Sequence, residues 1–363
     1  MRIILFGGFF NPIHNGHIQA AFQAMEKINA RKVIFFPSYE PFDKKENYEY
    51  ISMTDRMEML NQVIKNVPNF ELDNFEYLAQ KKCYMIDLVK YLRKKYYNNN
   101  IYILIGSDQL ENIKKWKDYD TLIELASFIC YEREGYKINE ETLSKHDFVF
   151  IHSSNNSISS TNIRNNMYRY DLPYRALKYI NEHGLYFVSR VLPFMTTKRF
   201  EHSIRVGLMA YELMQKYDNK KAIKGWVAGI YHDICKEFDK DRIEFLAYDK
   251  YHVEYTKYWK ILHGIVAKYF LKETFNFDDE EILNAIANHT KPNHDKKQLT
   301  TLDKVLFLAD KLEPNRTEKD VTKIDEIRKL AKANLDQAYD KLLDTLEEMY
   351  ACKNETETSK ETR

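Results

Sequence analysis

The chain has 363 residues, which is more than one ordinary hydrophobic core uses, so we expect two domains. Its composition, 44% hydrophobic and 30% charged, excludes a disordered chain. A net charge of +1 argues against binding to nucleic acid through the overall charge of the protein. No apolar run is long enough to cross a membrane, we expect no signal peptide, and the scattered cysteines indicate reduced thiols in a cytoplasmic protein.

Residues 1–188 alternate short apolar runs with amphipathic stretches. The runs typical of strands are 2–6, 33–36, 101–105, 128–131 and 148–152, and the stretches typical of helices are 17–29, 54–66 and 84–96. This alternation predicts an α/β domain with a doubly wound parallel sheet, whose ligands bind at the carboxyl ends of the strands. His14, Asp108 and Ser159 each follow an expected strand, so we expect them at one edge of the sheet.

The pattern changes after Val188. From residue 193 to residue 350 the sequence predicts successive helices, with breaks near Pro292 and Pro314, and therefore an all-α second domain. Residues 353–363 are polar and lack apolar anchors, so we expect a disordered tail there.

Paired glycines and a pair of histidines follow the first expected strand, in the run G-G-F-F-N-P-I-H-N-G-H over residues 7–17. Glycines let the backbone approach phosphates closely, and a helix N-terminus offers unpaired N–H groups and the positive end of a dipole. His14 and His17, on the first helical turn, can donate hydrogen bonds to phosphate oxygens where charge builds up. Taken alone the pattern H-x-G-H is weak, since Gly-His turns also cap helices.

Two further motifs follow in the same half of the chain: I-G-S-D at residues 105–108 with W-K-D-Y at 116–119, and I-S-S-T-N-I-R at 158–164. Together with H-x-G-H, and in this order, they resemble the signature of the nucleotidylyltransferase superfamily, and more narrowly the bacterial nicotinate-nucleotide adenylyltransferase family. The likeness covers roughly the first half of the chain.

The resemblance implies that nicotinate mononucleotide attacks the α-phosphate of ATP, with Mg²⁺ carried by the ATP. It implies that His14 and His17 contact the triphosphate, with His17 at the α-phosphate in the transition state. It also implies phosphate contacts for Ser160 and Thr161, a β/γ-phosphate clamp for Arg164, and a lysine near the phosphates, Lys44 or Lys45. The full implied set of substrate-binding residues in this half is Gly7, Gly8, Phe9, Asn11, Lys44, Gly106, Asp108 for the ribose or adenosine, Trp116 near the pyridine ring, Ser160, Thr161 and Arg164.

One departure from the family pattern concerns the pyridine end of the substrate. Where the family has S-Y-T-x-x-T, this chain reads C-Y-M-I-D-L over residues 83–88, with Met85 and Leu88 in place of the threonines. The choice between nicotinate and nicotinamide mononucleotide therefore stays open. Transfer to phosphopantetheine is an alternative, but the Trp116 segment and the I-S-S-T-x-I-R motif favour the nicotinate branch.

Histidines and aspartates dominate the candidate chemistry of the second half. Imidazole and carboxylate ligands suit iron, manganese or zinc, and this set is large enough for two ions, with Asp233 able to bridge them. A metal pair can lower the pKa of a bound water and brace the phosphate that it attacks. A single His-Asp pair is more often a core feature, but six residues spread over several expected helices outweigh that reading. The six are His202, His232, Asp233, His263, His289 and Asp310.

This half resembles the YqeK family of HD-domain phosphohydrolases over most of residues 195–316. The resemblance implies symmetrical hydrolysis of diadenosine tetraphosphate to two ADP, with Asp233 as a catalytic residue and iron as the metal, manganese or zinc being the alternatives. It implies that Arg199, Lys236 and Arg316 hold polyphosphate charge. We therefore expect a fused bifunctional enzyme without a nucleic-acid or membrane partner. A helical domain that only senses nucleotides is the alternative, and the oligomeric state stays open.

Overall fold

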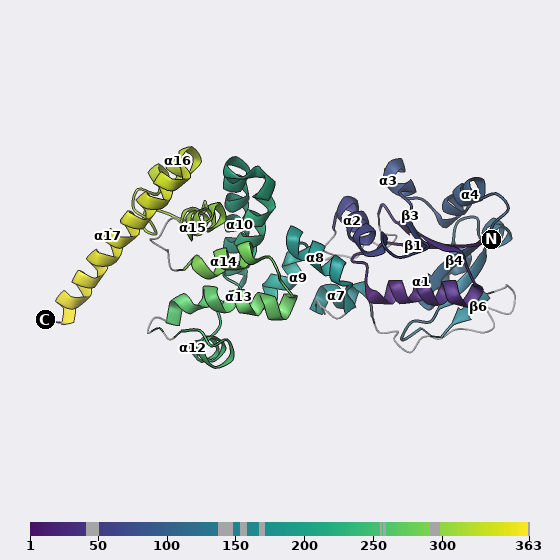
Figure 1. Cartoon of the computed structure of the whole chain (residues 1–363), viewed down its shortest axis with the longest axis horizontal. Helices are drawn as coiled ribbons and strands as arrows, with labels where there is room; N and C mark the ends of the chain where they lie inside the picture. Colours follow the sequence, from purple (N-terminus) through teal and green to yellow (C-terminus); the bar gives the residue numbers. More distant parts are fainter. Residues whose placement is uncertain are drawn as a thin grey trace. The chain divides into compact units, whose positions relative to one another are not determined.

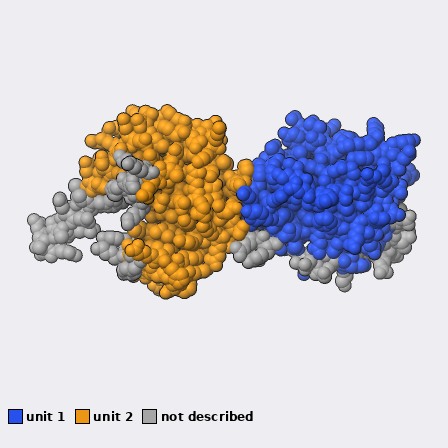
Figure 2. Space-filling model, in the orientation of Figure 1, with its two compact units in different colours: residues 1–179 blue, residues 180–363 orange. Residues whose placement is uncertain are grey.

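The computed structural model describes residues 1–40, 51–136, 148–152, 158–166, 171–254, 256, 259–290 and 298–361. Within them the chain forms two compact units, Met1–Tyr179 and Ile180–Arg363 (Figure 2). Among the described residues, no helix has the length and apolar character needed to cross a membrane.

The first unit is built on a six-stranded, wholly parallel sheet with the strand order β3-β2-β1-β4-β5-β6. This is the order of a doubly wound sheet, which confirms the predicted fold class. Figure 1 shows this sheet with α1 and α2 beside it. The strands are β1 Arg2–Gly8, β2 Lys32–Pro37, β3 Phe70–Leu72, β4 Asn100–Gly106, β5 Ser127–Tyr131 and β6 Phe148–Ile151. The helices are α1 Asn15–Ile28, α2 Met53–Ile64, α3 Phe75–Ala79, α4 Met85–Lys95, the 3₁₀ helix η1 Ser107–Lys115, α5 Tyr119–Leu125 and α7 Ser160–Asn166, while α8 Tyr174–His183 begins in this unit and ends in the second.

Helices cover both sides of the sheet, and the central strands bury apolar side chains on both faces. Ile3 and Leu5 of β1 belong to a core that also contains Ile86 and Val89 of α4. The alternate residue Phe6 packs toward Phe35 of β2, with ring centroids 5.4 Å apart. Parallel strands buried on both faces read as continuous hydrophobic runs, which is why the sequence predicts them well.

β3 was missed in the sequence because it is an edge strand of three residues, of which only Phe70 is fully buried. Its register is set by Val33 of β2, which pairs with Phe70. So short a strand carries too little periodicity to be recognised from its own residues.

The second unit is helical, which confirms the predicted all-α half. Its helices are α9 Phe187–Val191, α10 Thr197–Tyr217, α11 Ala222–Tyr231, α12 Lys240–Glu244, the π-helix η5 Phe245–Lys250, α13 Leu262–Phe275, α14 Glu280–Asn288, α15 Thr301–Leu312, α16 Ile324–Ala333 and α17 Leu335–Glu361, with short 3₁₀ turns η3 Leu192–Phe194, η4 Asn219–Lys221 and η6 Trp259–Ile261.

Glycines let α10 and α11 cross closely. A Cβ on Gly225 would lie 2.6 Å from the carbonyl oxygen of Ala210, and a Cβ on Gly229 would overlap the backbone of Gly207. Neither position therefore accepts a side chain without moving a helix. This close crossing brings His202 of α10 and His232, which follows α11, within 5.4 Å of each other, measured between ring centroids.

The compact units divide earlier in the chain than the predicted domain boundary at residue 188. Asn181 donates a hydrogen bond to the carbonyl of Phe275 at 3.1 Å, and the guanidinium of Arg190 lies 4.4 Å from the ring centroid of Phe275. These contacts fold the segment 181–191 with the helices that follow it. The predicted domain limits stay predictions. So does the disordered tail at 353–363, because side chains from residue 350 onward lie outside the described part of the chain.

Candidate active sites in the two units

A cavity of about 620 Å³ lies in the first unit at the carboxyl ends of β1, β4 and β5. This is the edge where a doubly wound sheet binds its ligands. Of the residues predicted from the sequence, its lining includes Gly7, Gly8, Phe9, His14, His17, Gly106, Asp108 and Trp116. Two motifs that are far apart in the sequence therefore meet in one cavity, and of the I-S-S-T-N-I-R motif Ile158 lines it.

The histidine pair sits where the loop after β1 enters α1. The two imidazole rings stack with centroids 3.6 Å apart, and the backbone N–H of His14 donates to Nδ1 of His17 at 3.2 Å. Gly8, the second of the paired glycines, leaves room for the ring of Phe10, since a Cβ on Gly8 would lie 2.9 Å from Cζ of Phe10. Nδ1 of His17 is an acceptor in this arrangement, so the ring proton of neutral His17 is on Nε2.

Both histidines are uncharged at neutral pH. Burial, with the charges of Arg133 and Arg164, lowers the pKa of His14 to about 3. Burial, with His14 and Arg133 nearby, holds the pKa of His17 well below its usual range. Nδ1 of His14 has no hydrogen-bond partner among the described residues. The pair can therefore act as neutral hydrogen-bond donors to an anion in the cavity, without first losing a proton.

Asp108 faces an arginine across the cavity wall. Its Oδ2 accepts a hydrogen bond from Arg133 at 3.2 Å, while its Oδ1 is buried and has no partner within the described chain. Gly106 leaves the room for this pair, because a Cβ there would lie 2.7 Å from Cδ of Arg133. A buried carboxylate oxygen without a donor is costly, so Oδ1 is an acceptor available to a hydroxyl group.

The I-S-S-T-N-I-R motif holds the loop that carries the histidines. Ser160 donates to the carbonyl of Pro12 at 3.0 Å, and Arg164 donates to the carbonyl of Asn11 and to Oγ1 of Thr161, the latter at 3.0 Å. Arg164 is only 5% exposed. None of the motif's predicted phosphate-binding residues is among the described residues that line the cavity. Their phosphate contacts stay a prediction.

Trp116 ends η1 and is shared between the cavity and the core, since its ring lies 6.4 Å from that of Phe128 in an edge-to-face arrangement. Lys44 and its alternative Lys45 lie outside the described residues. Met85, in place of the family threonine, packs against β1: its Cε lies 3.1 Å from the position of a Cβ on Gly7.

Sequence reasoning missed several polar side chains of the cavity, among them Arg133, Lys117 and Tyr84. Nζ of Lys117 lies 4.6 Å from the ring centroid of Tyr84. The available signal for Arg133 was its position just beyond β5, the same position relative to a strand that Asp108 has beyond β4.

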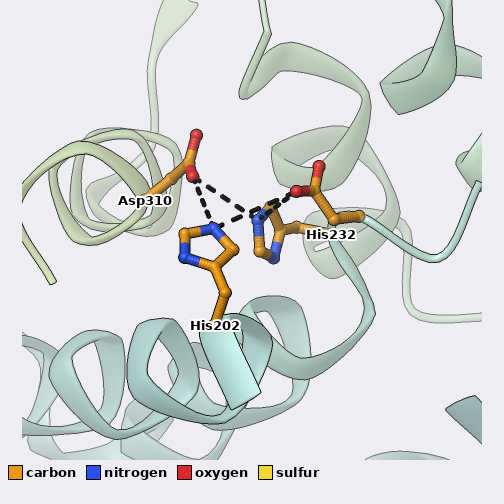
Figure 3. Close-up of side chains that lie close together, drawn as sticks. His202, His232 and Asp310 are labelled. Carbon is orange, nitrogen blue, oxygen red and sulfur yellow. Dashed lines mark hydrogen bonds and ion pairs between the residues drawn. The ribbon is translucent and has the colours of Figure 1, made fainter. Parts of the chain in front are cut away.

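In the second unit, the six predicted metal ligands come together as one buried group, which we call the ligand cluster. It contains two sets of ligand atoms, each set lying within 4.8 Å: His202, His232, Asp233 and Asp310 form one, and Asp233, His263 and His289 form the other. Figure 3 shows His202, His232 and Asp310 of the first set pointing toward one another from separate elements.

Asp233 belongs to both sets through different oxygens. Its Oδ2 lies 3.4 Å from Nε2 of His232, and its Oδ1 lies 3.1 Å from Nε2 of His263 and 3.4 Å from Nε2 of His289. A carboxylate that offers one oxygen to each of two ligand groups is suited to bridging two metal ions, as the sequence suggested.

The hydrogen bonds of the histidines indicate that a cation belongs between them. Nδ1 of His232, His263 and His289 lies 2.6 to 2.8 Å from a backbone carbonyl in each case, so in the neutral form of each ring Nδ1 carries the proton and Nε2 presents a lone pair. Nε2 of His263 lies 3.3 Å from Nε2 of His289, and Nε2 of His232 lies 3.4 Å from Oδ2 of Asp233 and 3.6 Å from Oδ1 of Asp310. Lone pairs that face each other fit a metal ion, and outer partners of this kind orient metal-bound histidines.

His202 has a different outer partner, the carboxylate of Glu313, which the sequence analysis did not single out. Glu313 is 2% exposed and lies 3.2 Å from Nδ1 of His202. It also accepts from Arg205 at 2.7 Å and from the backbone N–H of Asn315 at 2.8 Å. Burial opposes its charge, but these donors lower the pKa of Glu313 to about 2.

Cationic side chains lie beside the ligand cluster, and the binding of polyphosphate by these side chains stays a prediction. Lys311, which the sequence analysis did not propose, also contacts Asp310. Burial lowers the pKa of Lys236. The distances for the three predicted cations are 2.8 Å from Arg199 to Asp233, 3.2 Å from Lys236 to His263 and 3.6 Å from Arg316 to Asp310.

The fold and the two sites define a nucleotidyltransferase-type unit joined in one chain to an HD-type helical unit. Comparison with family models agrees, since the cytidylyltransferase-like model matches residues 5–166 and the HD-domain model matches residues 199–315.

Similar proteins extend over nearly the whole chain. A Mycoplasma genitalium protein named "probable nicotinate-nucleotide adenylyltransferase/Ap4A hydrolase" is 38% identical over 343 residues, which cover 93% of this chain and 95% of that protein. A Mycoplasma pneumoniae protein of the same name is 32% identical over 311 residues, or 85% of this chain and 88% of that one. A "probable nicotinate-nucleotide adenylyltransferase" of Methylacidiphilum infernorum is 35% identical over 202 residues, or 53% of this chain and 95% of that one. The chain belongs to the family of fused nicotinate-nucleotide adenylyltransferase/Ap4A hydrolase proteins.

Proposed function

We propose that this chain is a bifunctional enzyme with one active site in each unit. The first unit transfers AMP from ATP to nicotinate mononucleotide and forms deamido-NAD and pyrophosphate. The second unit hydrolyses diadenosine tetraphosphate to two ADP. The similarity to fused relatives over 93% of the chain supports both activities together, and the ligand cluster with its facing imidazoles is the structural observation that carries the hydrolase.

In the first reaction, a phosphate oxygen of nicotinate mononucleotide attacks the α-phosphorus of ATP, and the bond from that phosphorus to the bridging oxygen of pyrophosphate breaks. Positioning and charge stabilisation supply most of the acceleration in such a transfer. We assign the transition-state contact to His17, whose Nε2–H can donate to an α-phosphate oxygen. Asp108 would accept a ribose hydroxyl through Oδ1, and Mg²⁺ would enter with the ATP.

Neutrality of the histidine pair suits this role. A neutral imidazole has one N–H, and His17 keeps it on Nε2 because Nδ1 accepts from the backbone of His14. The positive charge near the triphosphate then comes from arginines, and Arg133 lies close enough to lower the pKa of both histidines. We add Arg133 to the proposed phosphate-binding residues on this ground.

In the second reaction, water adds to one phosphorus of the tetraphosphate bridge, and the central bridging oxygen leaves with the other ADP. The ligand cluster would hold two metal ions, and such a pair supplies a water of lowered pKa and charge neutralisation at the phosphate when bound. Asp233 would hold both ions. Arg199, Lys236 and Arg316 would neutralise the remaining phosphate charge. The nitrogen and carboxylate ligands suit iron, which we propose first, with manganese and zinc as alternatives.

The remaining assignments are narrower. We propose that the enzyme is cytoplasmic, which the buried free thiols Cys83, Cys130 and Cys235 support. We keep nicotinate mononucleotide as the acceptor, although Met85 occupies the place of a family threonine. Lysines on the cavity wall, Lys115 and Lys117, favour an acceptor that carries a carboxylate.

Two assays on the purified chain test the proposal. The first presents ATP with nicotinate mononucleotide, nicotinamide mononucleotide or phosphopantetheine, and we expect the fastest pyrophosphate release with the first acceptor. The second presents diadenosine tetraphosphate after metal analysis and reloading with iron, manganese or zinc, and we expect ADP as the nucleotide product. Absence of hydrolysis with every metal would reduce the second unit to a nucleotide-sensing domain.

A further inference from the structure

Arg56, on α2, is a buried charge that the proposed reactions do not use. Its side chain is 1% exposed, and it is one of the largest fully buried side chains of the described structure. A guanidinium group is buried only where acceptors surround it. Four backbone carbonyls accept from it here, and most of them belong to the loops that form the nucleotide cavity.

Arg56 ties together the loops that follow β1 and β2. Its NH1 donates to the carbonyl of Phe9 at 2.7 Å, and its NH2 donates to the carbonyls of Ser38 at 2.9 Å and Tyr39 at 3.2 Å. Its Nε donates to Ile51 at 3.3 Å, just before its own helix. The guanidinium also lies 4.0 Å from the ring centroid of Phe9. Phe9 and Ser38 line the cavity, so one buried side chain spans two of its walls.

The loops after β1 and β2 need the hydrogen bonds of Arg56 to fix their spacing, because the sheet ends before these loops. The last register pair between β1 and β2 is Gly8 with Pro37, and one more backbone bond follows, from the N–H of Ser38 to the carbonyl of Gly8 at 2.9 Å. Beyond that point, no ladder among the described residues sets the distance between the histidine loop and the opposite wall. The forked guanidinium takes over this task with fixed donor directions.

A second buried residue, Glu76 of α3, extends these hydrogen bonds around the cavity. Its carboxylate accepts from the backbone N–H of Tyr39 at 2.9 Å and from that of Cys83 at 3.3 Å. Tyr39 is therefore held through its carbonyl by Arg56 and through its N–H by Glu76. The chain of bonds ends at Cys83, where α4 and the pyridine side of the cavity begin.

We propose that Arg56 is a positioning residue for adenylyl transfer, which sets the spacing between the loop that delivers His14 and His17 and the wall formed by Ser38 and Tyr39. This inference rests on the proposed transferase function. Arg56 does not line the cavity, so it acts through the loops and not by contact with substrate. A displacement of reacting groups by about 1 Å lowers a rate by about 10²-fold.

The test is Arg56→Lys in the full chain, with Arg93→Lys as a matched control. Arg93 lies in the same unit and also donates to backbone carbonyls: Nε and NH2 to Leu125, at 2.9 Å for Nε, and NH1 to Asn99 at 2.9 Å. Leu125 and Asn99 precede β5 and β4, at the edge of the sheet opposite the cavity. Both changes keep the charge and lose the fork, so both lower the melting temperature.

Only Arg56→Lys is expected to change the kinetics of the transferase. We expect kcat to fall by about 10²-fold while the KM for ATP changes by only a few-fold, because alignment is lost more than affinity. Arg93→Lys should keep kcat within about threefold of the parent. Hydrolysis of diadenosine tetraphosphate should be unchanged in both. An Arg56→Lys variant with the kcat of Arg93→Lys overturns the inference, since its role would then be structural alone.

A second variant covers the case in which Arg56→Lys does not fold. Glu76→Gln keeps the shape of the side chain and weakens its hydrogen bond with the backbone N–H of Tyr39, so the kcat of the transferase should also fall, by about 10-fold. An unchanged kcat overturns the inference. Failure of the function itself looks different. If the parent chain does not transfer AMP to any of the three acceptors, the proposed function fails before Arg56 is tested.

Discussion

Replacing Glu313 by glutamine tests the metal centre without removing a ligand. The carboxylate of Glu313 lies 3.2 Å from Nδ1 of His202 and accepts from Arg205 at 2.7 Å. Its pKa falls from 4.5 to about 2, although burial works against the charge. That difference corresponds to about 3 kcal/mol in favour of the charged form. Glutamine has the same shape but no charge, and its NH₂ group must face either Nδ1 of His202 or the donors Arg205 and Asn315.

We expect Glu313→Gln to weaken metal binding by about 10- to 100-fold, the usual effect of losing the outer partner of a metal-bound histidine. Metal content by mass spectrometry and metal titration measure the loss directly, and hydrolysis of diadenosine tetraphosphate should fall with it. AMP transfer by the first unit is the internal control. The matched variant Glu281→Gln removes a glutamate that pairs with Lys221 and Lys224, away from the ligand cluster, and should keep its metal. Equal metal affinity in both variants would refute the role given to Glu313.

Four further predictions follow from the two sites. His17→Ala should lower kcat of AMP transfer by about 10²-fold or more and leave hydrolysis intact, and equal damage to both activities in a folded protein would contradict the two-site arrangement. Asp233→Ala, which removes a ligand from both sets, should abolish metal-dependent hydrolysis and spare the transferase in the same assays. Burial opposes charge on His232, but Asp233 and Asp310 raise its pKa to about 9, so metal binding below that pH must displace a proton from His232. Calorimetry in buffers of different ionisation enthalpy should therefore show proton release on metal binding, and the metal affinity should rise with pH toward 9. Gly229→Ala should lower the melting temperature of the second unit, because its Cβ would overlap Gly207, and an unchanged value would mean that α10 and α11 can separate at no cost.

Much of the first unit could be predicted from the sequence, because its signals are local. Buried parallel strands are short apolar runs, and the residues that follow them are the residues that reach the cavity. His14 and Asp108 were found in this way, whereas Trp116 was found from the family resemblance, and all three line one cavity. The family likeness, recognised from motif order, is confirmed by relatives that match 85% to 93% of the chain. β3 escaped because three residues at a sheet edge carry almost no periodicity.

The class of fold in each half, the families to which the two halves belong and the identity of the six cluster residues can be read from the sequence alone. How those residues meet can be seen only in the folded chain. Asp233 offers separate oxygens to two histidine groups because α10 and α11 cross at glycines and the later helices fold back on them. Arg56 and Glu313 carry no motif of their own, and their importance lies in partners far along the chain. Periodicity and motifs report what a segment does locally, whereas a polar contact between distant segments exists only once the hydrophobic core has set their distance.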